Sequence, residues 1–166
     1  MDWSYYFKEM SKVYEKLDPS HQHSAFSKFE GQNSFIRDYG LEVVPLVRAA
    51  TQEYEQMMGS GFTPYPELIE FIKNAQGYEM FVYSSNSRAT VTKGLEELEI
   101  ANYFKKIVSR DEATYIKPDP DGFKLIYSPA VSKNEYLMIG NSYADKKMAA
   151  AVGIDFYLVD FFRPIF

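Results

Sequence analysis

The sequence predicts an α/β fold with a parallel sheet, preceded by an all-helical segment. From residue 61 onward, short apolar runs alternate with stretches of helical periodicity, as in βαβ units with right-handed crossovers. Before residue 60, apolar residues recur only at helical spacing. The chain therefore divides into a helical segment over residues 1–60 and an α/β segment over residues 61–166.

Three helices are expected in the helical segment. The clearest covers residues 3–17, whose apolar side chains form one stripe at helical period. A weaker helical stretch covers residues 25–38 and is interrupted by Gly-Gln-Asn at residues 31–33. The third begins near Pro45, a good first-turn residue, and ends at a flexible Gly-Ser-Gly joint over residues 59–61. A segment of this size suits a lid better than an independent domain.

The α/β segment begins with a helix over residues 66–75, and strands then alternate with helices to the end. Apolar runs bounded by polar turns mark the strands, and apolar residues at helical spacing mark the helices. The expected strands cover residues 80–83, 106–109, 136–139 and 154–159, and the expected helices cover residues 88–98, 121–127 and 144–152.

The composition excludes several classes of protein. Apolar residues make up 46% of the 166 residues, which is enough for a core and argues against disorder. A net charge of −5 without a basic cluster argues against a nucleic-acid partner. The absence of cysteine excludes disulfides and thiolate metal sites. No apolar run reaches 18 residues and no signal-like start is present, so we expect a cytoplasmic protein without a membrane partner.

Three polar clusters follow one another along the α/β segment. Ser-Ser-Asn at 84–86 follows one predicted strand, Lys-Pro-Asp-Pro at 117–120 lies in a loop, and residues 140–145 follow another strand. Each cluster alone favours a structural interpretation, as a helix N-cap, a solvated turn or a strand-to-helix turn. Because parallel strands end at the same edge of a sheet, the clusters together predict one pocket for a small anion.

These clusters resemble the second, third and fourth motifs of the haloacid dehalogenase-like (HAD) hydrolase superfamily, over nearly all of residues 61–159. The resemblance implies a Rossmann-like core with an N-terminal helical cap, and hydrolysis of a small phosphorylated metabolite by a magnesium-dependent aspartate. It also implies a role for each cluster. Ser85, with Asn86 beside it, would bind a phosphoryl oxygen, the Lys117 ammonium would offset negative charge, and Asn141 and Asp145 would bind Mg²⁺.

Two departures from the family pattern bear on activity. Asn141 replaces the usual first acid of its motif, so Mg²⁺ should bind more weakly. The Asp-x-Asp-Gly-Thr loop that carries the family's nucleophile does not occur in these residues, and Asp2 lacks both a preceding strand and the partner residues. We therefore expect the chain as given to be inactive alone.

The strand that precedes this loop in the family lies in the middle of the sheet, between the strands that end near Ser85 and Asn141. Without it, buried backbone groups of both neighbours lose their partners, at about 1–3 kcal/mol each. The two flanking strands could close the gap, another segment could fill it, or the natural chain could start upstream of Met1. The sequence favours the last.

Two other functions stay open. The chain could be a catalytically inactive HAD-like protein that binds an anion or a partner, or a metal-independent hydrolase of the haloacid dehalogenase type, as Asn141 suggests. Among minor candidates, Arg37 and Arg48 could reach an anionic substrate, but solvated positions are the better expectation. His21 and His23 lack a partnered acid at ligand spacing and are also expected to be solvated.

Overall fold

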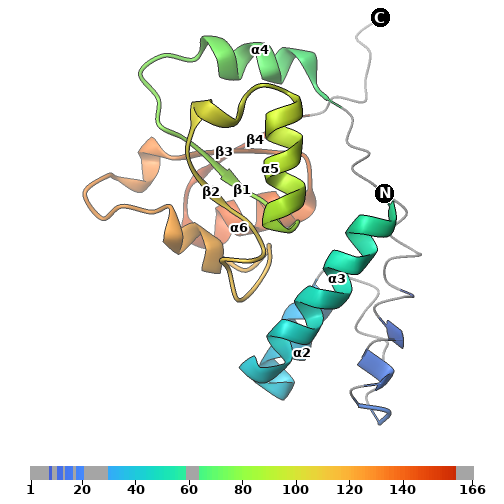
Figure 1. The fold of residues 1–166 in the computed structure, drawn as a ribbon. Helices are drawn as coiled ribbons and strands as arrows, with labels where there is room; N and C mark the ends of the chain where they lie inside the picture. Colours follow the sequence, from blue (N-terminus) through green and yellow to red (C-terminus); the bar gives the residue numbers. More distant parts are fainter. Residues whose placement is uncertain are drawn as a thin grey trace, which may run out of the picture.

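The computed structural model describes residues 8, 11–12, 14–16, 18–20, 30–58 and 64–159. Figure 1 shows two helices, α2 and α3, running together beside the α/β part of the chain, which follows them in sequence. Most of the helix predicted over residues 3–17 lies outside the described residues, as do Asp2, His21, His23 and the joint at 59–61. Within the described ranges, no helix has both the length and the apolar character needed to cross a bilayer.

The helical segment contains α2 (Glu30–Tyr39), the short 3₁₀ helix η2 (Leu41–Val43) and α3 (Val44–Met58). Helix α2 continues through residues 31–33, so the predicted interruption there is wrong. A cluster of buried apolar side chains holds these helices together, and Tyr39, Ala50 and Tyr115 pack against it. Its members are Tyr14, Phe35, Ile36, Val43, Val44 and Val47.

Asn33 explains why α2 persists through a weak helical sequence. Its side chain is 2% exposed and faces the α/β part. The amide Nδ2 donates to the carbonyl oxygen of Ile116 at 2.7 Å, and the Ile116 N–H donates back to Asn33 Oδ1 at 2.9 Å. This tertiary contact outweighs the low helix propensity of the Gly-Gln-Asn run.

Two arginines dock the helical segment on the same loop. Arg37 forms an ion pair with Asp119 at 2.5 Å, and its guanidinium lies 4.9 Å from the ring centre of Tyr115. Arg48 donates to the carbonyl oxygen of Ala113 at 2.9 Å. The Arg37 side chain is 53% exposed, as expected for a solvated position, although it also pairs with Asp119. Arg48 is half-buried and binds the α/β part, so the expectation of solvation is wrong for Arg48.

The α/β part follows the predicted order of elements. Helix α4 begins with Pro66 at its first turn, and Ser87 and Ser142 cap the N-termini of α5 and α6. The helix predicted over 121–127 is instead a 3₁₀ helix. The elements are α4 (Pro66–Asn74), β1 (Met80–Tyr83), α5 (Arg88–Glu97), η3 (Ala101–Tyr103), β2 (Phe104–Val108), η4 (Asp121–Leu125), η5 (Lys133–Glu135), β3 (Leu137–Gly140), α6 (Tyr143–Val152) and β4 (Asp155–Leu158).

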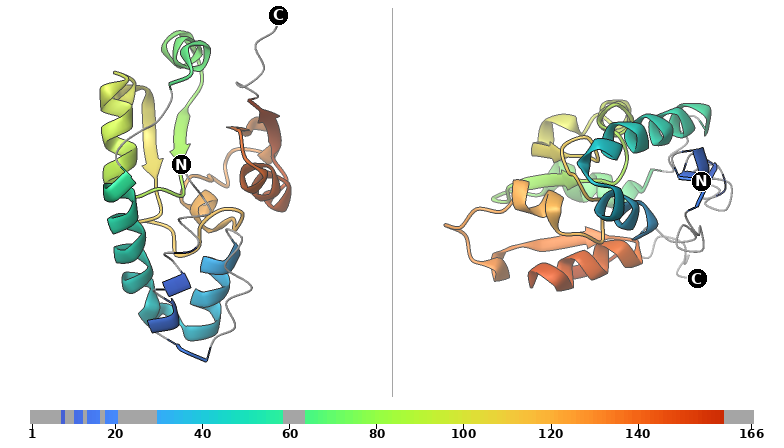
Figure 2. Two further views of the ribbon diagram at one scale, coloured as in Figure 1. Left: turned by 90° about the vertical axis from the view of Figure 1, so that its right-hand side faces the viewer. Right: turned by 90° about the horizontal axis from the view of Figure 1, so that it is seen from below.

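The four strands form two separate parallel pairs. Strand β1 pairs with β2, with Val82 opposite Ile107, and β3 pairs with β4, with Met138 opposite Phe156. Figure 2 shows the two pairs as distinct ribbons. Among the described residues, no backbone hydrogen bond joins β1 to β3. One alternative considered from the sequence was that the two flanking strands close the gap. The structure does not show this pairing.

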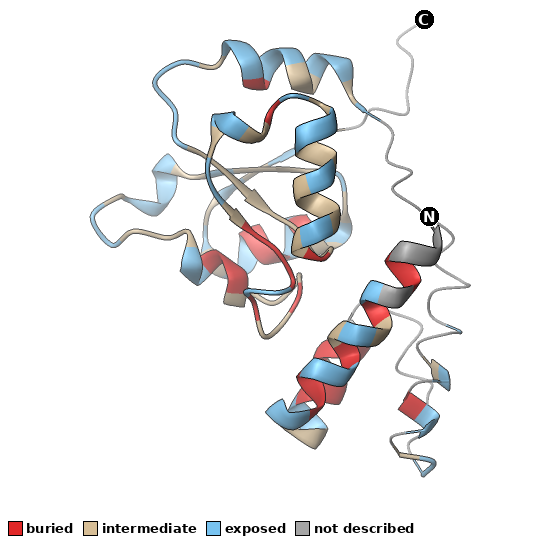
Figure 3. Cartoon of the chain, in the orientation of Figure 1, coloured by how far each residue is buried: buried red, intermediate tan, exposed pale blue. Residues whose placement is uncertain are grey.

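The strands are poorly buried for a parallel arrangement. Every residue of β1 is half-buried, Leu137 at the start of β3 is 58% exposed, and Val108 is the one fully buried residue in the four strands. Figure 3 shows the same contrast, with buried positions along α2 and α3, in the loop after β2 and on η4 and α6. Parallel strands are normally covered on both faces of the sheet. Among the described residues, the apolar core cluster lies in the helical segment.

Candidate functional site

Lys117 connects the carboxyl ends of the two strand pairs. Its Nζ donates to the carbonyl oxygen of Tyr83, the last residue of β1, at 2.8 Å. The same atom donates to Asp145 Oδ1, in the first turn of α6, at 2.6 Å. The two charged side chains are 11% and 7% exposed. The loop lysine and the motif after β3 thus meet at one place, as the parallel-edge argument predicted.

Asp145 is held by the N-terminus of its own helix as well as by Lys117. Its Oδ2 accepts from the Ser142 N–H at 3.0 Å and from the Ser142 hydroxyl at 2.7 Å, while the Asp145 N–H donates to Ser142 Oγ. Burial raises the pKa of the Asp145 carboxyl, but the charge of Lys117 and the hydrogen bonds from Lys117 and Ser142 outweigh burial and leave the pKa below its usual value. Asp145 is therefore an ionised carboxylate at neutral pH.

Gly140 makes the close seat of Asp145 possible. A Cβ atom at residue 140 would lie 2.6 Å from Asp145 Oδ2 and 2.7 Å from its Cγ, closer than van der Waals contact allows. Packing against the Asp145 carboxylate thus requires the glycine that ends β3. Any larger residue at this position must displace the carboxylate.

Tyr83 holds the lysine loop against the end of β1. Its hydroxyl donates to the carbonyl oxygen of Asp119 at 3.0 Å, and the Lys117 ammonium lies 5.1 Å from its ring centre. Burial is the main reason why the pKa of the Tyr83 hydroxyl is raised. Gly122 leaves room for the ring, because a Cβ there would lie 2.3 Å from Tyr83 Cε2.

The loop after β1 carries Ser85 and Asn86. The Ser84 N–H donates to Val108 O, the Asn86 N–H donates to Ser84 Oγ at 3.1 Å, and Asn86 O accepts from the Arg110 N–H at 3.0 Å. These bonds fix the backbone of the loop. The Ser85 side chain is half-buried, and its hydroxyl makes no hydrogen bond to another described residue. Ser85 therefore has a hydroxyl that is available to a ligand.

Asn141 is exposed and directly follows β3. With Asp145 it offers one carboxamide and one carboxylate as ligands for a hard cation, and both oxygens of Asp145 already accept hydrogen bonds from Lys117 and Ser142. No group of three or more histidine or acidic side chains that could hold a metal occurs in the part of the chain that the structure describes. These two side chains alone would leave most coordination positions of a hard cation to water or to a bound ligand.

A second polar cluster near this edge was not predicted from the sequence. Glu55 of α3 and Arg110, two residues after β2, form a buried ion pair at 2.6 Å. Glu55 also accepts hydrogen bonds from Ser87 and Thr90 at the start of α5. The position of Arg110 just beyond the carboxyl end of a strand was a usable signal, because that is where parallel sheets gather functional side chains.

Comparison with known families and relatives gives consistent matches. Residues 4–159 match the model of the haloacid dehalogenase-like hydrolase family. The chain is 27% identical over 121 residues to pyrophosphatase PpaX of Bacillus velezensis, covering 72% of this chain and 54% of that protein. It is 29% identical over 128 residues to phosphoglycolate phosphatase of Pseudomonas savastanoi pv. phaseolicola, covering 75% and 44%. The chain thus spans about half the length of these two relatives.

Solved structures with a similar fold belong to the same group. A Bacteroides fragilis protein described as a haloacid dehalogenase-like hydrolase aligns with a TM-score of 0.61 and 20% identity, over 96% of this chain and 81% of that one. A Lactobacillus plantarum protein described as a phosphoglycolate phosphatase gives 0.59 and 19%, over 94% and 78%. The HAD-hydrolase YfnB of Bacillus subtilis, in a form bound to magnesium, gives 0.57 and 18%, over 99% and 74%. At these identities the likeness establishes the fold.

Proposed function

Since the chain belongs to the haloacid dehalogenase-like hydrolases, we propose that it binds the phosphoryl group of a small phosphorylated metabolite and serves in its hydrolysis. The observation that carries this proposal is the Lys117 ammonium, held between Tyr83 O and Asp145 at the carboxyl edge of the strands. The pyrophosphatase and phosphoglycolate phosphatase relatives support a phosphorylated substrate.

The proposed phosphoryl site uses Lys117, Ser85 and Asn86. An ammonium group has three N–H donors, and two of those on Lys117 are taken by Tyr83 O and Asp145. The third can reach a phosphoryl oxygen, and the Ser85 hydroxyl can donate to another. A buried positive charge with a fixed geometry stabilises the negative charge of a phosphoryl group without reorganisation, which is the dominant protein contribution to phosphoryl transfer.

We assign Asp145 and Asn141 as the protein ligands of a magnesium ion. Mg²⁺ prefers six oxygen ligands and commonly binds through one or two carboxylates together with substrate phosphate and water. Two protein ligands are consistent with a metal that binds together with the phosphorylated ligand rather than before it. Magnesium would neutralise charge on the phosphoryl oxygens. Because Lys117 already binds Asp145, cation binding must compete with that ion pair.

The helical segment over residues 1–60 is proposed as a cap over the α/β core of residues 61–166. Its contacts support this role, because Asn33, Arg37 and Arg48 all bind the loop over residues 113–119, which contains Lys117. A cap in this position would exclude water from the lysine and select the substrate.

The nucleophile is the component that these residues do not supply. Asp145 is committed to Lys117 and Ser142. Asp119 accepts from Arg37 and from the Asp121 N–H, so it is engaged as well. The Asp-x-Asp-Gly-Thr loop is absent from the sequence. We therefore expect phosphate binding by the chain alone, but no turnover of a phosphomonoester.

Binding is tested by titrating inorganic phosphate into the chain in a calorimeter. We expect Lys117→Met and Ser85→Ala to weaken binding and Lys105→Met to leave it unchanged. Lys105 is a matched control because its ion pair with Glu79 lies on the surface, with side chains 59% and 65% exposed. Unchanged phosphate affinity in both Lys117→Met and Ser85→Ala would refute the assignment.

Turnover is tested with p-nitrophenyl phosphate and magnesium. We expect none from the chain alone, and magnesium-dependent hydrolysis after a designed apolar strand and an Asp-x-Asp-Gly-Thr loop of the family pattern are joined to Met1. Addition of a chelator should abolish this hydrolysis. Release of halide from a 2-haloacid in the presence of the chelator would instead favour the dehalogenase alternative suggested by Asn141.

A further inference from the structure

The N-terminus of α5 is an anion site that a side chain of the protein already occupies. The Glu55 carboxylate, from α3, accepts from the Ser87 N–H at 3.2 Å and from the Ser87 hydroxyl at 2.6 Å. It also accepts from the Thr90 hydroxyl at 2.8 Å and from Arg110 Nη1 at 2.6 Å. A helix of ten residues directs its positive end toward this group. Glu55 is thus bound as an oxyanion would be.

Arg110 has more donors than Glu55 can use. Its side chain is 4% exposed, and both Nε and Nη2 are buried without a hydrogen-bond partner among the described residues. Buried guanidinium donors without partners are destabilising and rare in folded proteins. A carboxylate presents only two oxygens, whereas a phosphoryl or sulfuryl group presents three or four. The donor set therefore fits a tetrahedral oxyanion better than the carboxylate that occupies it.

The backbone N–H of Arg88, next to Ser87 in the first turn of α5, is not one of the donors to Glu55. The Arg88 N–H donates to Asp111 Oδ2 at 2.7 Å, so a second carboxylate already satisfies it. An incoming anion would have to replace Glu55 alone. It would then meet the N–H and hydroxyl of Ser87, the hydroxyl of Thr90 and the guanidinium of Arg110.

We propose that Ser87, Thr90 and Arg110 form a second site for a tetrahedral oxyanion, and that oxyanion binding and the docking of α3 through Glu55 exclude each other. The two events are linked because they use the same donors. Each must weaken the other by the same factor. The apparent association constant for the anion is therefore the intrinsic constant multiplied by the fraction of molecules in which Glu55 is undocked.

The site also lies next to the loop that carries Ser85. Arg110 donates from its backbone N–H to Asn86 O and from Nη1 to Ser85 O at 3.4 Å. An anion that draws Arg110 away from Glu55 would act on a side chain that also contacts this loop. The second site does not require that Ser85 and Lys117 bind a phosphoryl group, so the two proposals can fail separately.

Binding is tested by calorimetry with inorganic phosphate on Glu55→Gln, on Glu55→Gln combined with Arg110→Gln, and on Glu42→Gln. Removing the competing charge should raise phosphate affinity about tenfold or more, which is about 1.4 kcal/mol. The added Arg110→Gln change should abolish this gain. Glu42, exposed in the same segment, should give the affinity of the unaltered protein. A gain that survives the loss of Arg110, or no gain in a folded Glu55→Gln protein, would overturn the proposal.

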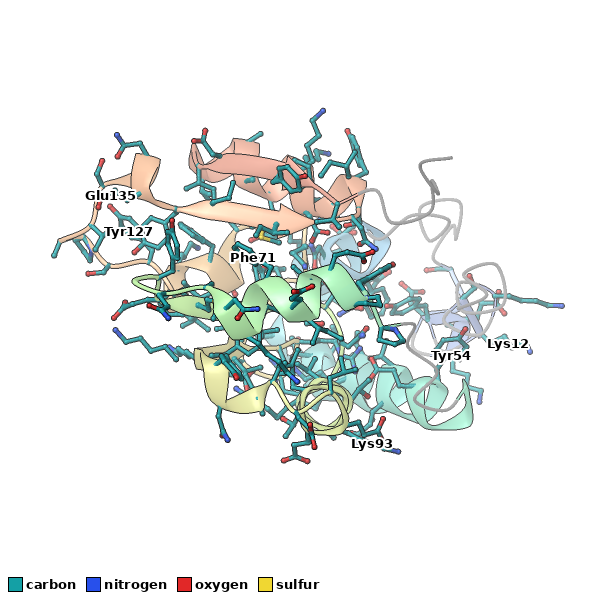
Figure 4. The ribbon with its side chains drawn as sticks, turned by 90° about the horizontal axis from the view of Figure 1, so that it is seen from above. Lys12, Tyr54, Phe71, Lys93, Tyr127 and Glu135 are labelled. Atoms are coloured by element: carbon teal, nitrogen blue, oxygen red, sulfur yellow. The ribbon has the colours of Figure 1, made fainter. Side chains whose placement is uncertain are left out.

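Movement of α3 is tested in a chain that keeps Glu55. The sequence has no cysteine, so Gln52→Cys on α3 and Lys93→Cys on α5 give a single pair of sites for spin labels. Both positions are exposed, and Lys93 projects from the outer side of α5 (Figure 4). Phosphate should shift the distance distribution between the labels, and Arg110→Gln should remove the response to phosphate. A distribution that stays the same at saturating phosphate would exclude competition with Glu55.

The two proposals give different results in the same titrations. If phosphate binds Glu55→Gln in an Arg110-dependent way and is indifferent to Lys117→Met, the second site exists and the proposed phosphoryl site at Lys117 is wrong. If Lys117→Met weakens phosphate binding and Glu55→Gln leaves it unchanged, the phosphoryl site at Lys117 exists and the proposed second site is wrong.

Discussion

Breaking the ion pair between Lys117 and Asp145 should cost far more stability than breaking a surface pair of the same chemistry. At a separation of 2.6 Å and an effective dielectric constant near 20, the direct attraction is about 6 kcal/mol. Desolvation of both groups offsets part of that attraction. Removal of one partner leaves the other charge buried, and comparable cases lose about 3–5 kcal/mol.

A double-mutant cycle separates the coupling from the individual effects. The variants are Lys117→Met, Asp145→Asn and the double substitution, each unfolded in urea and followed by far-ultraviolet circular dichroism. We expect a coupling free energy of about 2–3 kcal/mol, because neighbouring charged groups in one network couple in the range of about 0.5–3 kcal/mol and burial places this pair near the top of it.

The matched control is the exposed pair Lys105–Glu79, which has an N···O distance of 2.5 Å. The same cycle there, with Lys105→Met and Glu79→Gln, should give about 0–1 kcal/mol. Equal coupling at the buried and the exposed pair would refute the reasoning, because distance alone would then set the energy and burial would contribute nothing.

Three further outcomes are expected from contacts described above. Gly140→Ala should force Asp145 away from its seat and reduce both stability and phosphate binding, measured by urea unfolding and calorimetry; unaltered binding would contradict the close packing. Asn33→Ala should cost about 2–4 kcal/mol because it leaves both backbone groups of Ile116 without their partner, and a loss below 0.5 kcal/mol in urea would argue against that contact. The pKa of Asp145 lies below its usual value of 3.8, so its stabilisation is present above that value and disappears as pH falls through the lower, folded-state pKa. The stability difference between the unaltered protein and Asp145→Asn should therefore be constant from pH 6 to 8 and shrink below about pH 4, and a difference independent of pH down to 3 would contradict this.

Local sequence patterns predicted the order of the α/β elements, because each apolar run and each capping residue encodes its own strand or helix. The three polar clusters predicted the family through their resemblance to its motifs. The approach of Lys117 to Asp145 followed from one topological rule, that parallel strands end at one edge. The roles of Ser85, Lys117, Asn141 and Asp145 in binding remain predictions.

Contacts between distant parts of the sequence could not be predicted in this way. Glu55 and Arg110 are 55 residues apart, and nothing around Glu55 distinguishes it from a solvated helix residue. The continuity of α2 through residues 31–33 likewise depends on Asn33 meeting Ile116, 83 residues later. The pairing of strands was also beyond local patterns, because an apolar run identifies a strand without naming its neighbour.

The division of the four described strands into two pairs has a consequence for local unfolding of the molecule. A two-stranded sheet is marginal in water, and among the described residues no third strand pairs with either of these two sheets. Amide hydrogen exchange should therefore be slowest in α2 and α3, around Phe35 and Val47, and faster in β1 and β3. That order would reverse the usual ranking in α/β proteins, where the central sheet is the last element to lose protection. The small helical unit would then act as the scaffold on which the strand pairs depend.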